Sequence, residues 1–149
     1  MGILTTSSAP PVSSFDLALG QKPIILLVED ESIVRQVTRQ VLEHGGYRVL
    51  ESGGSREALR LAAEHRGNIR LLLSDVVMPE MNGPDLARRI RKIQPQLATV
   101  FMSGYTEAAI VQDAVQEQSA MYLQKPFTVE LLLSCVSAAL KNAADKSDS

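Results

Sequence analysis

Acidic, hydroxyl and amino side chains follow four short apolar runs of this 149-residue chain. Glu29 and Asp30 are adjacent, whereas Asp75, Ser103 and Lys125 come much later in the sequence. The apolar runs that lead to these side chains are Ile24–Val28, Leu71–Ser74, Ala98–Met102 and Met121–Gln124. Two carboxylates 4 Å apart repel each other by about 1 kcal/mol in water and by about 4 kcal/mol at an effective dielectric of 20. If the three acids meet, they call for a hard divalent cation, and we expect Mg²⁺ (or Mn²⁺).

The elements that must position these side chains follow an alternating pattern of short buried runs and longer amphipathic segments. This pattern predicts an α/β fold with a parallel sheet and crossover helices. The predicted strands are Ile24–Val28, Tyr47–Glu51, Ile69–Ser74, Ala98–Met102 and Met121–Gln124. The predicted helices are Ser32–His44, Ser55–His65, Pro84–Ile93, Thr106–Gln118 and Thr128–Lys141. Ligands of such sheets bind outside the carboxyl ends of the strands, so all five chemical residues are expected at one end of the sheet.

The expected cluster has the groups that phosphoryl transfer requires. A carboxylate can accept a phosphoryl group as an acyl phosphate, and Asp75 is the best candidate because it ends the central strand. The oxygens of the transferred group must then be neutralised. Lys125 can pair with one oxygen, and the hydroxyl of Ser103 can donate to another. We expect Asp30 to bind the metal directly and Glu29 to act mostly through water.

Composition and charge narrow the class of protein. The length fits one domain, and a net charge of −2 without a Lys/Arg run argues against direct nucleic-acid binding. No stretch reaches the length of a transmembrane helix, which predicts no membrane insertion. Cys135 is the single cysteine, which suits a reducing, cytoplasmic location and a buried thiol. We expect flexible tails or linkers over residues 1–22 and 142–149 around a domain over 23–141.

Four stretches of the chain resemble the receiver domain of bacterial two-component response regulators. They are Leu26-Leu27-Val28-Glu29-Asp30-Glu31, Asp75-Val76-Val77-Met78-Pro79-Glu80-Met81-Asn82-Gly83, Met102-Ser103-Gly104-Tyr105 and Lys125-Pro126-Phe127. The resemblance covers roughly residues 23 to 141. It implies a flavodoxin-like, doubly wound (βα)5 fold with the parallel strand order 2-1-3-4-5.

The resemblance also implies a role for each site residue. Asp75 would be the phosphoacceptor, and Glu29 and Asp30 the acidic pair of the magnesium site. The metal would take further ligands from Asp75 and from the backbone carbonyl of Val77. Ser103 would be the switch hydroxyl, Lys125 the ion-pair partner of the phosphoryl group, and Tyr122 the aromatic residue that changes rotamer. The family typically has a cis peptide bond before the residue that corresponds to Pro126.

The function implied by the resemblance is a signalling switch in a phosphorelay. A sensor histidine kinase or a histidine phosphotransfer protein would donate the phosphoryl group. The face formed by the fourth helix, the fifth strand and the fifth helix would then repack and bind a downstream protein. Phosphorylation-dependent homodimerisation through that face is compatible with the sequence, which does not require it. The domain would catalyse only its own Mg²⁺-dependent phosphorylation and dephosphorylation, so we expect a switch and not an enzyme.

Several details set this chain apart and leave alternatives open. Val77 cannot position an attacking water, and Tyr105 could shield the phosphoryl group, which predicts a long phosphorylated lifetime. The motifs look most like receivers attached to hybrid sensor histidine kinases, so the chain is either a stand-alone regulator or part of such a polypeptide. Rival interpretations are a flavin-binding module, a metal-dependent phosphatase and a receiver that acts without phosphorylation. The acids after the first strand disfavour the first rival, Val77 the second, and the intact site residues the third.

Overall fold

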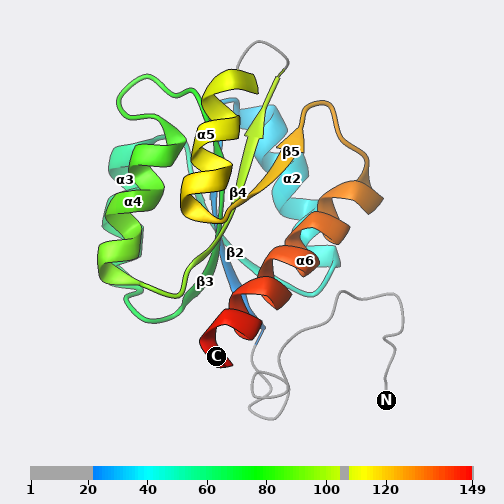
Figure 1. Cartoon of the computed structure of the whole chain (residues 1–149). Coiled ribbons are helices and arrows are strands. Elements are labelled where there is room, and N and C mark those ends of the chain that lie inside the picture. Colours follow the sequence, from blue (N-terminus) through cyan, green and yellow to red (C-terminus); the bar gives the residue numbers. More distant parts are fainter. Residues whose placement is uncertain (1–21, 105–107, 149) are drawn as a thin grey trace, which may run out of the picture.

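The computed structural model describes residues 22–104 and 108–148, which form a five-stranded parallel sheet flanked by helices (Figure 1). The strands are β1 (Ile24–Val28), β2 (Arg48–Ser52), β3 (Ile69–Asp75), β4 (Ala98–Ser103) and β5 (Met121–Gln124). The helices are α2 (Ser32–His44), α3 (Ser55–Glu64), α4 (Gly83–Ile93), α5 (Ala108–Gln118) and α6 (Val129–Asp148). The spatial order β2-β1-β3-β4-β5 confirms the doubly wound fold and the strand order that we expected.

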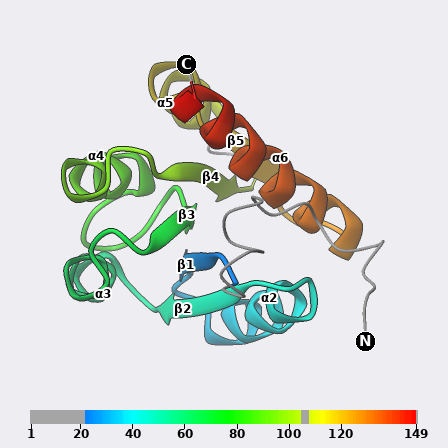
Figure 2. The same cartoon turned by 90° about the horizontal axis from the view of Figure 1, so that it is seen from below.

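Both faces of the sheet are covered by helices. Helices α2 and α6 lie on one face and α3, α4 and α5 on the other (Figure 2). Alternate residues of the central strand β3 therefore enter two separate cores. Leu71 and Leu73 pack on the α2 and α6 side, and Leu72 packs on the opposite side. Burial on both faces explains why the strands read as almost continuous apolar runs.

Local sequence signals determine where several helices begin and end. Helix α2 stops at Gly45-Gly46, where the N–H of Gly46 donates to the carbonyl of Glu43 and that of Tyr47 to the carbonyl of Leu42, both at 3.1 Å. Gly46 has a φ of 100°, which favours glycine at this position of the terminating turn. At the start of α6, the Thr128 hydroxyl accepts a hydrogen bond from the N–H of Leu131 at 3.0 Å, so Thr128 caps this helix.

The structure moves some of the predicted boundaries. Strands β3 and β4 are one residue longer than predicted, so Asp75 and Ser103 are strand residues that still pair with their neighbours. Strand β2 is shifted by one residue, because Tyr47 belongs to the turn that ends α2. The second predicted helix ends one residue earlier, at Glu64, and the third begins one residue earlier, at Gly83. Thr106, the predicted start of the fourth helix, lies outside the described residues.

The predicted end of the last helix at Lys141 was wrong. Helix α6 continues to Asp148 through Asn142-Ala143-Ala144-Asp145 and beyond. This stretch contains no glycine or proline that would stop a helix, and alanine has the highest helix propensity. Ala143 also packs against the core on the α6 side of the sheet, which stabilises the extension. Among the residues that the structure describes, no helix is both long enough and apolar enough to cross a bilayer.

Candidate metal and phosphoryl site

The parallel register brings the predicted site residues to one end of the sheet. Asp75 is paired with Met102, and Ser103 with Gln124, so the ends of β3, β4 and β5 lie level. The N–H of Lys125 donates to the carbonyl of Ser103 at 2.9 Å, which extends this alignment one residue past β5. The sheet therefore positions Asp75, Ser103 and Lys125 beside one another, as the sequence predicted.

The three acids form a compact group. One carboxylate oxygen from each of Glu29, Asp30 and Asp75 lies within 4.8 Å of the others. Glu29 and Asp75 are 1% and 5% exposed, whereas Asp30 is exposed at the mouth of the site. All the donors are hard carboxylate oxygens, and the group has access to solvent through Asp30. The donor set thus fits a hard divalent cation that keeps some of its water.

Lys125 lies between the two buried acids. Its Nζ donates to both carboxylate oxygens of Glu29, at 2.9 and 3.0 Å. The same Nζ lies 2.6 Å from Oδ1 of Asp75, an ion-pair contact whose angles are not those of a hydrogen bond. Burial alone would lower the pKa of Lys125, but its close contacts with the carboxylates of Asp75 and Glu29, and their negative charges, outweigh burial and raise that pKa. Lys125 is therefore held as a cation at the site.

The protein groups alone leave the carboxylate of Asp75 poorly compensated. Burial, followed by the nearby carboxyl group of Glu29 and its negative charge, raises the pKa of Asp75 from 3.8 to about 8, although Lys125 opposes the shift. One ammonium group balances two buried carboxylates only in part. Further positive charge at this position would favour the ionised form of Asp75. The uncompensated negative charge of the site and its carboxylate donors thus both favour a bound cation.

The hydroxyl of Ser103 points to the side chain of Tyr122. Ser103 Oγ lies 3.2 Å from the Tyr122 hydroxyl oxygen and 3.3 Å from the carbonyl oxygen of Gly104. The Tyr122 hydroxyl in turn lies 3.4 Å from the carbonyl oxygen of Ser103, to which it can donate. The hydroxyl predicted to bind the phosphoryl group is thus in contact with the aromatic residue predicted to respond to it.

The loop after Asp75 is tied to helix α4. The N–H of Gly83 donates to the carbonyl of Val76 at 2.7 Å, and the Val76 N–H donates to the carbonyl of Met102 at 3.0 Å. The side chain of Val77 is 56% exposed at the mouth of the site. The role of the Val77 carbonyl as a metal ligand stays a prediction.

The peptide bond between Lys125 and Pro126 is cis, as the resemblance implied. Tyr105 lies outside the described residues.

Sequence reasoning missed two contributors to the site. Arg35 of α2 turns back and donates from Nη1 to the carbonyl oxygen of Glu29 at 2.7 Å. Gly83 approaches the backbone of Asp75 so closely that a Cβ built on it would lie 2.3 Å from the Asp75 carbonyl oxygen. The glycine of the Asp-x-x-Met-Pro-x-x-x-Gly segment was a visible signal for the second contact. An arginine on the first helix gave no comparable signal.

Comparisons with known proteins agree with this geometry. The family model described as the response regulator receiver domain matches residues 25–137. The chain is 39% identical over 117 residues to the sensor kinase CckA of Brucella abortus, which covers 78% of this chain but only 12% of that kinase. It is 36% identical to the response regulator receiver protein CpdR of the same organism, covering 74% of this chain and 90% of that protein.

A solved structure supports the same assignment. The receiver domain of the hybrid histidine kinase CckA is 36% identical and superposes with a TM-score of 0.67, covering 78% of this chain and 98% of that domain. The fold, the cluster of acids at the carboxyl end of the sheet and the match over most of the chain lead to one conclusion. The chain belongs to the family of response regulator receiver domains, the signalling domains of two-component systems.

Proposed function

We propose that the domain is a phosphoacceptor switch in which Asp75 receives a phosphoryl group from a phosphohistidine. The observation that carries this proposal is the convergence of three carboxylates, Lys125 and Ser103 at the carboxyl end of the sheet. A bound Mg²⁺ (or Mn²⁺), held by Asp30, Asp75, the Val77 carbonyl and Glu29 through water, would neutralise charge on the acids and on the phosphoryl oxygens.

The proposed reaction uses this chain's own residues as follows. A carboxylate oxygen of Asp75 attacks phosphorus, so an O–P bond forms while the N–P bond to the donor histidine breaks. The imidazole nitrogen leaves with the bonding electron pair and takes up a proton. Lys125, which already lies 2.6 Å from Asp75, pairs with a phosphoryl oxygen, and the Ser103 hydroxyl donates to another. The product is an aspartyl phosphate.

The signal would leave the site through Ser103 and Tyr122. A Ser103 hydroxyl that donates to a phosphoryl oxygen can no longer donate to Tyr122 or Gly104. Loss of that bond changes the position preferred by the Tyr122 ring on β5. The face of α5, β5 and α6, which contains the fourth and fifth predicted helices, would repack and bind a downstream protein or a second copy of the chain.

The donor is proposed to be a sensor histidine kinase or a histidine phosphotransfer protein. Exposed apolar side chains follow the site residues closely in sequence, among them Ile33 at the start of α2, Val77 after β3 and Val129 at the start of α6. The donor protein would contact these side chains as a rim around the site. A protein that brings its phosphohistidine to Asp75 must cover this rim. Ile33→Gln should therefore slow transfer from a panel of autophosphorylated sensor kinases but leave phosphorylation by acetyl phosphate unchanged. If Ile33→Gln accepted the phosphoryl group from the kinases as fast as the parent chain does, Ile33 would be excluded from the docking surface.

The larger context of the domain is also part of the proposal. Because this chain spans 12% of the CckA kinase and 24% of the regulator NtrC of Azospirillum brasilense, a receiver can belong to a much longer protein. The 39% identity to CckA favours attachment to a hybrid histidine kinase, with a stand-alone regulator as the alternative. In both settings the domain itself would be a cytoplasmic switch that catalyses only its own Mg²⁺-dependent phosphorylation and dephosphorylation.

The direct test is phosphorylation by a small donor. The chain is incubated with acetyl phosphate and Mg²⁺, and its intact mass is measured beside that of Asp75→Asn. One added phosphoryl group that requires both Mg²⁺ and Asp75 supports the proposal. Metal binding without an adduct would restrict the site to a protein donor, and absence of both would favour a receiver that acts without phosphorylation.

A further inference from the structure

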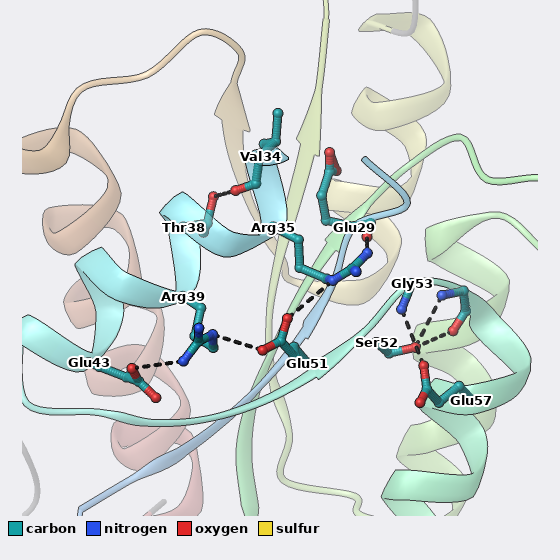
Figure 3. A network of polar contacts seen from close by, with 11 residues as sticks. Glu29, Val34, Arg35, Thr38, Arg39, Glu43, Glu51, Ser52, Gly53 and Glu57 are labelled. Carbon is teal, nitrogen blue, oxygen red and sulfur yellow. Dashed lines mark hydrogen bonds and ion pairs between the residues drawn. The ribbon is translucent and has the colours of Figure 1, made fainter. Parts of the chain in front are cut away.

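The peptide unit that joins the two acids of the site is held from behind by a side chain of helix α2. Nη1 of Arg35 donates to the carbonyl oxygen of Glu29 at 2.7 Å (Figure 3). The N–H of Glu29 donates to the carbonyl of Ser52 on β2 at 3.1 Å. Both backbone polar groups of Glu29 are thus bonded, while its carboxylate is paired with Lys125. The carbonyl of Glu29 and the N–H of Asp30 belong to one planar unit, so the Arg35 contact orients both acids.

Arg35 is itself fixed by the neighbouring strand. Its Nε donates to Oε1 of Glu51 on β2 at 3.2 Å (Figure 3). The guanidinium group is planar and presents its donors in a fixed fork, so two bonds to two elements define its position. The Arg35 side chain is only 21% exposed, which reduces screening by solvent. This arrangement couples β1, β2 and α2 at the loop that contains Glu29 and Asp30.

We propose that Arg35 is a positioning residue for the metal and phosphoryl site, acting through the peptide unit between Glu29 and Asp30. This inference rests on the proposed function of the site. Asp30 is exposed, so the orientation of its side chain depends on the backbone. If the peptide unit were not anchored, the Asp30 carboxylate could adopt several orientations. Loss of a residue that orients metal ligands typically lowers metal affinity by about 10- to 100-fold.

Charge and geometry predict opposite results when Arg35 is removed. The guanidinium is a positive charge beside a site for a cation, so its loss should by Coulomb's law strengthen cation binding. If Arg35 acts by orienting the acids, its loss should weaken binding in spite of the improved charge. The sign of the change in affinity therefore separates a positioning role from a purely electrostatic one.

Arg39 provides a matched control on the same helix. It lies one turn further along α2, and its Nε is 2.8 Å from Oε2 of the same Glu51. Its Nη1 donates to Glu43 at 3.3 Å (Figure 3). Arg39→Ala removes one positive charge and one ion pair with Glu51, as Arg35→Ala does. The bond to the Glu29 carbonyl is what distinguishes Arg35.

The experiment measures Mn²⁺ affinity by electron paramagnetic resonance of the free ion at constant ionic strength. We expect Arg35→Ala to weaken binding about 10-fold or more, Arg35→Lys to recover part of the loss, and Arg39→Ala to stay close to the parent chain. Phosphorylation by acetyl phosphate at saturating metal should recover in Arg35→Ala, because only metal binding is impaired. Circular dichroism checks that each variant is folded, and if Arg35→Ala is not, Arg35→Lys and Glu51→Gln provide the comparison.

Two results would overturn the inference. Arg35→Ala, or its substitutes, could bind Mn²⁺ as tightly as the parent chain or more tightly, which is the electrostatic result. Alternatively, Arg35→Ala and Arg39→Ala could weaken binding equally, which would indicate a general effect of the ion-pair network on folding. If the parent chain itself bound no Mn²⁺, the proposed function would fail first, so the two failures are distinguishable.

Discussion

Gly83→Ala should damage both the stability and the chemistry of the domain, because Gly83 touches the backbone of Asp75. A Cβ at position 83 would lie 2.3 Å from the carbonyl oxygen of Asp75 and 3.2 Å from its carbonyl carbon. Ordinary contacts of a Cβ begin at 3.4 Å, so the two segments must separate by about 1 Å. The obstacle is backbone at the end of a central strand, and Leu86 and Ile90 anchor α4 in the core. Neither the end of β3 nor helix α4 can therefore move away easily.

The size of both effects follows from this displacement. Overpacking of this kind costs about 1–3 kcal/mol. The higher helix propensity of alanine recovers at most about 1 kcal/mol. A net loss of about 1–2 kcal/mol corresponds to roughly 3–10 °C in Tm for a domain of this size. A misplacement of about 1 Å at a reacting group can reduce the rate about 100-fold, so phosphorylation by acetyl phosphate should slow to that extent.

Urea unfolding and the rate of adduct formation, read from intact mass, measure the two effects. Gly46→Ala is the control, since Gly46 has a φ of 100° with no atom within 4 Å of an added Cβ. It should lose about 1 kcal/mol through backbone strain and keep the parent rate of phosphorylation. A Gly83→Ala variant as stable and as fast as the parent chain would refute the steric argument.

Three further predictions concern the site. The pKa of Asp75 is raised from 3.8 to about 8, so without divalent cations the free energy of unfolding should fall as pH rises from about 4 to 8, by at most about 1.4 kcal/mol per pH unit. Urea titrations should show a flatter slope in Asp75→Asn. A slope in Asp75→Asn equal to that of the parent chain would contradict the assignment of this slope to Asp75. Tyr122→Phe removes the hydroxyl bonded to Ser103 and should cost about 1 kcal/mol in urea unfolding, and it should limit the hydrogen-exchange changes that phosphorylation causes in β5 and α6. Val77→Asn places a polar side chain at the mouth of the site and should shorten the phosphorylated lifetime about tenfold or more, measured by loss of the adduct over time; a parent lifetime of seconds would contradict the prediction from Val77.

The order of elements was predictable because each strand is buried on both faces. A short apolar run such as Ile24–Val28, placed between longer amphipathic segments, predicts a strand of a parallel sheet that is buried on both faces. The convergence of Asp75, Ser103 and Lys125 followed from the parallel order alone, since all three lie where strands end. The close ion pairing of Lys125 with both Glu29 and Asp75 depends on burial, which a linear pattern does not give.

Other features depended on contacts that a single sequence does not reveal. The end of α6 was misjudged because its last turns are small and polar, and the contact of Ala143 with the core appears only in three dimensions. The bond from Arg35 to the Glu29 carbonyl joins a side chain to backbone, and periodicity is blind to such pairs. The predicted tail over residues 1–22 lies almost wholly outside the described residues and stays a prediction.

The most direct test of the central claim is to locate the phosphoryl group chemically. The chain is treated with acetyl phosphate and Mg²⁺, the acyl phosphate is reduced with borohydride, and the peptides are sequenced by mass spectrometry. Reduction of an aspartyl phosphate leaves homoserine, and the account predicts homoserine at position 75, dependent on Mg²⁺ and absent without acetyl phosphate. Homoserine at Asp30 or elsewhere, or none in a chain that binds Mg²⁺ and accepts phosphate by intact mass, would contradict Asp75 as the phosphoacceptor.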